Sequence, residues 1–180
     1  MDRTIMSTEA PINLLLHDIQ YQVTETAWGT WRRFVYPNGQ LFQEFTSHRA
    51  WAGLPLVHYT QGKCPETGKR IVAHGVIAIG RMARGLVAIG QASIGLIAIG
   101  QLGVGLLFGL GQAATGAVCI GQLALGMFFG VGQIATGYIA VGQIAVGTYV
   151  WAQMGWGDHV WDSRNVNAVA QDFFLRLVGK

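Results

Sequence analysis

Glycine recurs at nearly every fifth position from residue 75 to residue 157, and the residues between the glycines are almost all apolar. In each five-residue unit the third residue is apolar, the fourth is nearly always small, and the fifth is mostly Ile, Val or Leu. A helix turns about 100° per residue, so a five-residue step lines up no helical face, and each glycine costs a helix roughly 1 kcal/mol relative to alanine. We therefore expect short strands here, and no helix longer than two turns.

Two longer periods accompany the first. Glutamine follows glycine in alternate units, and Arg81 occupies the same place one step before the first glutamine. Residues 105–125 and 126–146 are identical at eleven of 21 positions, and each copy contains one six-residue step. A fixed period of this kind is typical of repeat architectures in which successive units stack.

These periods predict a mainly β chain in which residues 75–157 form a β-solenoid. Glycine near each corner takes backbone angles that other residues avoid, and each coil hydrogen-bonds to the next at about 4.8 Å. Four five-residue sides give a square coil of 20–21 residues and about four coils in all; a ten-residue coil, reversing every five residues, is the alternative. We expect the apolar third residue to face inwards, whereas the pattern leaves the direction of the fifth residue open.

Two resemblances support this interpretation. The units GQLAL and GQIAV resemble the pentapeptide-repeat family, although this chain has Gln where that family prefers Asp or Asn. The resemblance implies a square, right-handed solenoid. A closer resemblance, to uncharacterised bacterial glycine-pentad proteins, extends from GLPLVHYTQGKCPETGKRIVAHGVIAIG through the GLIAIGQ units. It implies the same kind of fold and no particular activity.

The flanking segments predict different elements. Residues 30–46 alternate apolar and polar residues around Pro-Asn-Gly and predict a β-hairpin that covers the first coil. A strand at residues 54–60 and a turn at residues 64–68 lead into the repeat. We thus divide the chain into a hairpin and capping region (1–74), the glycine-pentad solenoid (75–161) and a C-terminal helix (162–180).

The C-terminal segment carries one apolar stripe at helical spacing. We expect Asp162 or Ser163 to cap this amphipathic helix and Gly179 to end it. A solenoid needs covered ends because its terminal strand edges are otherwise unpaired, so the helix is predicted to lie over the last coil. Docking on a membrane surface or on a partner is the alternative. The stripe consists of Val166, Val169, Ala170, Phe173, Phe174, Leu177 and Val178.

Charge is distributed unevenly along the 180 residues. No charged residue occurs among the 73 residues from Gly85 to Gly157, and the net charge of +3 comes from scattered residues outside them. Nucleic acid is therefore a poor candidate partner, since its phosphates require a basic surface. The two cysteines form no recognisable pair and the first 20 residues do not resemble a secretory signal, so we expect a location in the cytoplasm or at the inner face of a membrane.

The sequence offers no convincing reaction chemistry. The GxGxxA patterns at Gly109 and Gly130 lack the acidic residue that a dinucleotide site needs, because the next one is Asp158. His58, Cys64 and His74 do not have the spacing of a zinc site, and Cys119 has no histidine near it in the sequence. We expect no catalytic residue, no cofactor and no metal, and hence no enzyme.

The repeated glutamines are the strongest candidates for a functional surface. A 20–21-residue coil would place them in two files on opposite sides, where their amides can bond along each file. A carbohydrate or ice surface is the alternative. Trp151, Trp156 and Trp161 are predicted to close the last coil against the helix, or else to form an assembly contact. The two files are Gln91, Gln112, Gln133 and Gln153 on one side, and Gln101, Gln122 and Gln143 on the other.

The uncharged segment determines the predicted function. A monomer in water rarely exposes an apolar patch larger than a few hundred Å². We therefore expect a non-enzymatic structural protein that associates with itself, as a homo-oligomer or fibre, through the solenoid walls. The alternative is a protein whose wall lies on or within membrane lipid; the two unpaired edges of a short solenoid argue against insertion.

Overall fold

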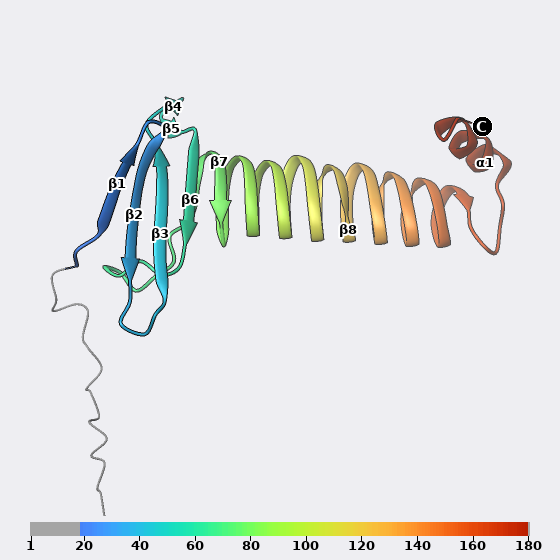
Figure 1. The fold of residues 1–180 in the computed structure, drawn as a ribbon. Coiled ribbons are helices and arrows are strands. Elements are labelled where there is room, and N and C mark those ends of the chain that lie inside the picture. The colour runs from blue at the N-terminus through green and yellow to red at the C-terminus, as the bar shows by residue number, and fades with distance from the viewer. Residues whose placement is uncertain (1–18, 180) are drawn as a thin grey trace, which may run out of the picture.

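The computed structural model describes residues 19–179, which are mainly β with one C-terminal helix, as expected (Figure 1). A single mixed sheet has the order β1-β2-β3-β6-β7-β8, antiparallel from β1 to β6 and parallel from β6 to β8. Two short strands, β4 and β5, pair separately. The elements are β1 (Gln22–Thr26), β2 (Gly29–Val35), β3 (Leu41–Ser47), β4 (Ala50–Trp51), β5 (Leu54–Pro55), β6 (Val57–Gln61), β7 (Ala73–Gly80), β8 (Met82–Trp161) and α1 (Ala168–Leu177).

The predicted hairpin is present. β2 and β3 pair in antiparallel register around a tight turn in which the Tyr36 amide donates to the Gln40 carbonyl at 2.8 Å. Gly39 has a φ of 78°, a conformation that glycine adopts without strain. The predicted turn at residues 64–68 is also present, with the Gly68 amide donating to the Cys64 carbonyl. The prediction about a secretory signal falls almost wholly on residues outside the described range.

β8 runs for 80 residues as one continuous strand wound into a coil (Figure 1). Its register with β7 advances by ten residues, as Ala73 pairs with Ala83 and Ile77 with Val87. The same spacing recurs further on, because a methyl group at Gly121 would overlap the carbonyl oxygen of Gly111. One turn therefore contains ten residues, and the predicted coil of 20–21 residues is wrong.

Two turns contain eleven residues. A methyl group at Gly111 would overlap the Gly100 carbonyl oxygen, and one at Gly132 would overlap that of Gly121. Each long turn contains one of the six-residue steps of the sequence. The 21-residue period is thus one turn of ten residues plus one of eleven. The sequence prediction had taken these two turns for a single coil.

The interior of the coil holds only small side chains. The buried position is the fourth of most units, and in the two six-residue units it is Gly109 or Gly130. The third residue, predicted to face inwards, lies mostly at the surface: Leu102 is 50% exposed and Phe128 60%. A turn of ten residues brings its two sides so close together that little more than a methyl group fits between them. The buried residues form two rows, Ala78, Ala88, Ala98, Cys119, Ala140 and Val150 in one, and Ala83, Ser93, Ala114, Ala124, Ala135 and Ala145 in the other.

The C-terminal helix is shorter than expected. α1 begins after Asn167, whose side chain accepts hydrogen bonds from the amides of Val169 and Ala170. The predicted caps, Asp162 and Ser163, lie in the preceding loop instead. Gly179 follows the helix with a φ of 80°, in agreement with its predicted role as the stop. Among residues 19–179, no helix has the length and the apolar character that are needed to cross a bilayer.

Candidate functional surface

The outward side chains of residues 85–157 form a surface without charge, here called the wall. Because the buried positions are taken almost entirely by small residues, the large apolar side chains of the other positions point outwards. Leu106 is 65% exposed, Met127 63% and Phe128 60%. These three belong to one side of the coil, and Ile94, Leu102 and Ile134 are exposed on the other side. The wall is therefore apolar around the coil.

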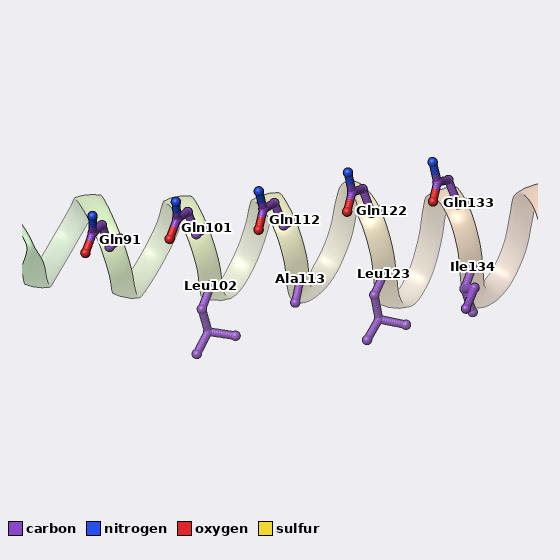
Figure 2. A pocket seen from close by; sticks show the side chains of 9 residues that line it. All are labelled: Gln91, Gln101, Leu102, Gln112, Ala113, Gln122, Leu123, Gln133 and Ile134. Atoms are coloured by element: carbon purple, nitrogen blue, oxygen red, sulfur yellow. The ribbon is translucent and has the colours of Figure 1, made fainter.

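The glutamines form one row along the wall (Figure 2). A ten-residue turn brings every glutamine of the repeat to the same side, so the prediction of two opposite files is wrong. The recurrence of glutamine every ten or eleven residues was the signal in the sequence that could have revealed this arrangement. Arg81 precedes the row, which consists of Gln91, Gln101, Gln112, Gln122, Gln133, Gln143 and Gln153.

A shallow groove runs beside this row. It has a volume of about 500 Å³ and is lined on its other side by Leu102, Ala113, Leu123 and Ile134 (Figure 2). The glutamines are exposed, and within the described residues no hydrogen bond joins the side chains of neighbouring glutamines in the row. Their amides therefore remain available to an outside partner.

The three tryptophans separate into two places. Trp151 and Trp161 stack with ring centroids 5.2 Å apart, and Trp151 lies 5.8 Å from the ring of Phe174 in α1. Trp156 lies apart from them, 49% exposed, with the Arg164 guanidinium 5.6 Å from its ring. The spacing of ten residues explains the division, because residues ten apart stack and residues five apart occupy opposite sides.

The loop before α1 covers the backbone of the last turn. The Asp162 carboxylate accepts from the Gly155 amide at 3.1 Å, and Arg164 donates to the Gly155 carbonyl at 3.0 Å. Ser163 donates to the Gln153 carbonyl at 2.8 Å. Hydrogen bonds from Arg164, and from the Gly155 amide, hold the pKa of the Asp162 carboxyl well below its usual value. Groups at the open edge are thus paired by Arg164 and by the two residues predicted as helix caps, Asp162 and Ser163.

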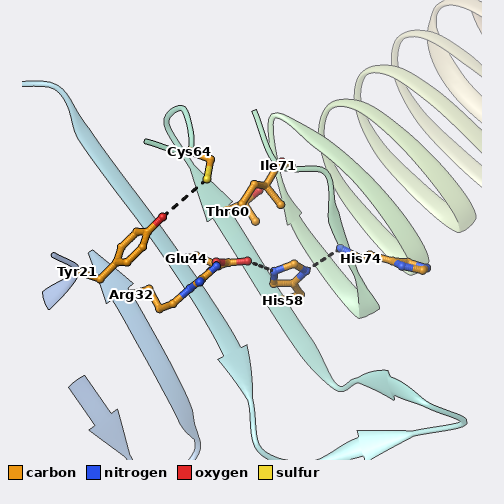
Figure 3. A network of polar contacts seen from close by, with 8 residues as sticks. All are labelled: Tyr21, Arg32, Glu44, His58, Thr60, Cys64, Ile71 and His74. Atoms are coloured by element: carbon orange, nitrogen blue, oxygen red, sulfur yellow. Dashed lines mark hydrogen bonds and ion pairs between the residues drawn. The ribbon is translucent and has the colours of Figure 1, made fainter. Parts of the chain in front are cut away.

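The first turn is covered by β6, the last strand of the N-terminal sheet (β1, β2, β3 and β6): its backbone pairs with β7, and its side chains add further hydrogen bonds (Figure 3). His58 Nδ1 accepts from the His74 amide at 2.8 Å, so its other nitrogen carries the hydrogen and donates to Glu44 at 3.0 Å. Thr60 donates to the Ile71 carbonyl at 3.1 Å. The His58 hydrogen bond, with the Arg32 guanidinium on the other side, holds the pKa of Glu44 below its usual value. This network was not anticipated from the sequence.

The residues weighed as metal ligands or nucleophiles have other surroundings. His58 is held between Glu44 and His74, and Cys64 lies 3.8 Å from the Tyr21 hydroxyl. No cluster of three metal-binding side chains occurs among residues 19–179. Cys119 is buried in the coil, and burial raises the pKa of its thiol, which disfavours the reactive thiolate.

Comparison with known proteins adds no family to this description. The chain matches no protein-family model, and neither a curated protein nor a solved structure is significantly similar to it. The wall, the glutamine row and the two covered ends are therefore the features that bear on function.

Proposed function

We propose that this chain is a non-enzymatic structural protein whose wound strand is a β-solenoid and whose copies associate with one another through the uncharged wall. The observation that carries this proposal is the single row of seven amides, five of which line a groove whose other side is apolar. Each amide both donates and accepts hydrogen bonds, so the row is complementary to the same row on a second copy.

The covered ends favour lateral over end-to-end association. Fibre growth along the axis needs unpaired backbone at both ends of the coil. At one end Asp162 and Arg164 bind the backbone of Gly155, and at the other β7 pairs with β6. Discrete oligomers joined side by side therefore fit this chain better than open filaments.

The exposed apolar side chains of the wall also favour contact between copies. Apolar side chains beside the row, such as Leu102 and Ile134, are about half exposed in the single chain. Contact between two copies would remove them from water together with the row, and burial of apolar surface contributes roughly 25 cal/mol per Å². The amides would set the register of the contact.

The test replaces glutamines in the row with lysine. Gln112→Lys with Gln133→Lys places two positive charges in the row, on either side of Gln122, and the same charges on a second copy would repel them. The matched control is Leu106→Lys with Met127→Lys, which adds the same two charges at the same spacing of 21 residues, at exposed positions on the side of the coil that carries no glutamine.

Particle mass, measured by light scattering in one buffer or one mild detergent for all variants, gives the result. We expect the glutamine variant to fall to a smaller mass while the control variant retains the parental mass. An unchanged mass for a folded glutamine variant would contradict association through the row. A monomeric parent would contradict self-association altogether.

A further inference from the structure

The wall beyond the glutamine row is apolar on every side. Leu106, Met127 and Phe128 are all at least 60% exposed, on the side of the coil that carries no glutamine. A contact between two copies along the row leaves that side uncovered. Exposed apolar surface of this extent marks a site of contact with protein or with a membrane.

The length of the wall matches the apolar part of a bilayer. Residues 85–157 make roughly seven turns, and at about 4.8 Å per turn they extend for about 34 Å along the axis of the coil. The hydrocarbon core of a typical bilayer is about 30 Å thick.

The backbone of the wound strand satisfies the main requirement of lipid. Every polar backbone group in lipid needs a partner within the protein. β8 remains in paired strand conformation over its whole length, and since β7 covers only its first turn, the later turns pair with one another. The edges expected to prevent insertion lie at the two ends of the coil, where Asp162 and Arg164 bind backbone groups at one end and β6 pairs with β7 at the other.

The residues at the two ends suit the two faces of a membrane. Arg81 and Arg84 directly precede the wall, and the N-terminal sheet lies beyond them (Figure 1). At the other end charge resumes with Asp158, after a group of aromatic residues. Tryptophan and tyrosine are enriched where a membrane meets water. The aromatic residues of the last turns are Tyr138, Tyr149, Trp151, Trp156 and Trp161.

From these observations we infer that the wound strand crosses a lipid bilayer with its axis along the membrane normal. The glutamine row is then the side on which copies meet, because polar side chains promote association within lipid. The inference rests on the proposed function in one respect: in both, the wall is the surface through which the protein acts.

Infrared dichroism of the full chain tests the orientation directly. Hydrogen bonds between turns run along the axis of the coil, so in oriented vesicles of phosphatidylcholine and phosphatidylglycerol the amide carbonyls of a spanning coil lie along the membrane normal. We expect that orientation, together with resistance of the bound protein to extraction at alkaline pH. Carbonyls in the membrane plane would mean that the coil lies on the surface, and would overturn the inference.

A pair of methionine substitutions tests the depth of the wall. Met127 lies near its middle and Met154 in its last turn, and both side chains are exposed. A lysine costs far more at the centre of a bilayer than near its surface. Met127→Lys should reduce the vesicle-bound fraction at least about tenfold, and Met154→Lys by about threefold or less. Equal effects of the two substitutions would contradict a spanning wall.

The outcomes also separate this inference from the proposed function. A water-soluble oligomer that does not bind vesicles would overturn the inference and leave self-association intact. A monomer that spans the membrane would support the inference and overturn self-association. A water-soluble monomer that does not bind vesicles would overturn both. Because the dichroism is measured on the unaltered chain, the result does not depend on the folding of any variant.

Discussion

The N-terminal sheet and the wound strand bury different kinds of side chain. In the sheet, Phe42 is completely buried and lies 6.1 Å from the ring of Tyr21, and Trp31 lies 5.0 Å from Phe45. In β8 the buried side chains are nearly all Ala, and the large ones are outside. The sheet therefore depends on side-chain packing, whereas the wound strand depends on regular backbone pairing between turns.

Electrostatics separates the two regions as well. The sheet contains a buried carboxylate, Glu44, held by Arg32 and His58. Residues 85–157 contain no acidic or basic side chain at all. Conditions that change protonation should thus act on the sheet and on the covered ends, and leave the middle turns untouched.

The largest expected effect comes from removing a phenylalanine in each region. Phe42→Ala should lower the free energy of unfolding by about 3–5 kcal/mol, because it leaves a cavity in the sheet. Phe128→Ala should lower it by less than about 1 kcal/mol, since that side chain is 60% exposed. Urea unfolding followed by tryptophan fluorescence measures both, and similar losses would show that the two regions do not differ in this way.

A methyl group added to one glycine in each region should reverse the contrast. Gly121→Ala places the methyl group against the Gly111 carbonyl oxygen of the previous turn, and we expect a loss of about 2–3 kcal/mol. Gly39→Ala meets no atom within 4 Å and should cost about 1 kcal/mol, through its positive φ alone. The same unfolding measurement applies, and a larger loss at Gly39 would refute close approach of the turns.

Acid should weaken the sheet and leave the wound strand unchanged. The pKa of Glu44 is lowered in the folded chain, so its stabilising effect is complete above the unfolded-state pKa of about 4.3 and is lost as pH falls through the lower folded value. We expect a loss of about 1–2 kcal/mol in the sheet below pH 4. Hydrogen exchange, resolved by region, should show no such change in residues 85–157. Glu44→Gln serves as the control and should lack this acid dependence.

The smallest effect is expected at the C-terminal helix. Asn167→Ala removes the side chain that accepts hydrogen bonds from Val169 and Ala170, at a cost of about 1 kcal/mol. Hydrogen exchange should increase within α1 and remain unchanged at Gly155, whose backbone is bound by Asp162 and Arg164. Faster exchange at Gly155 would show that the helix, and not the loop, covers the last turn.

Local sequence signals predicted the elements whose determinants lie close together in the chain. Pro37, Asn38 and Gly39 identified the hairpin turn, and Gly179 identified the end of the helix. The start of the helix was placed wrongly because Asp162 and Ser163 are good caps in isolation, but their hydrogen bonds go to Gly155 and Gln153 in the last turn. Such competition between local and distant partners is not visible in a short sequence window.

The sequence by itself determined that residues 75–157 are extended and repetitive and that residues 85–157 carry no charge, because glycine every five residues excludes a helical face and no charged residue follows Arg84 until Asp158. Only the tertiary structure decided that a turn contains ten residues. A ten-residue turn has a narrow interior that holds alanine-sized groups and lets glycine backbones of successive turns come close together. A longer turn would have a wide interior filled with leucine and isoleucine. Which of the two forms is more stable depends on the packing of whole stacked turns. The ten-residue turn is what places the glutamines in one row and the large apolar side chains on the outside.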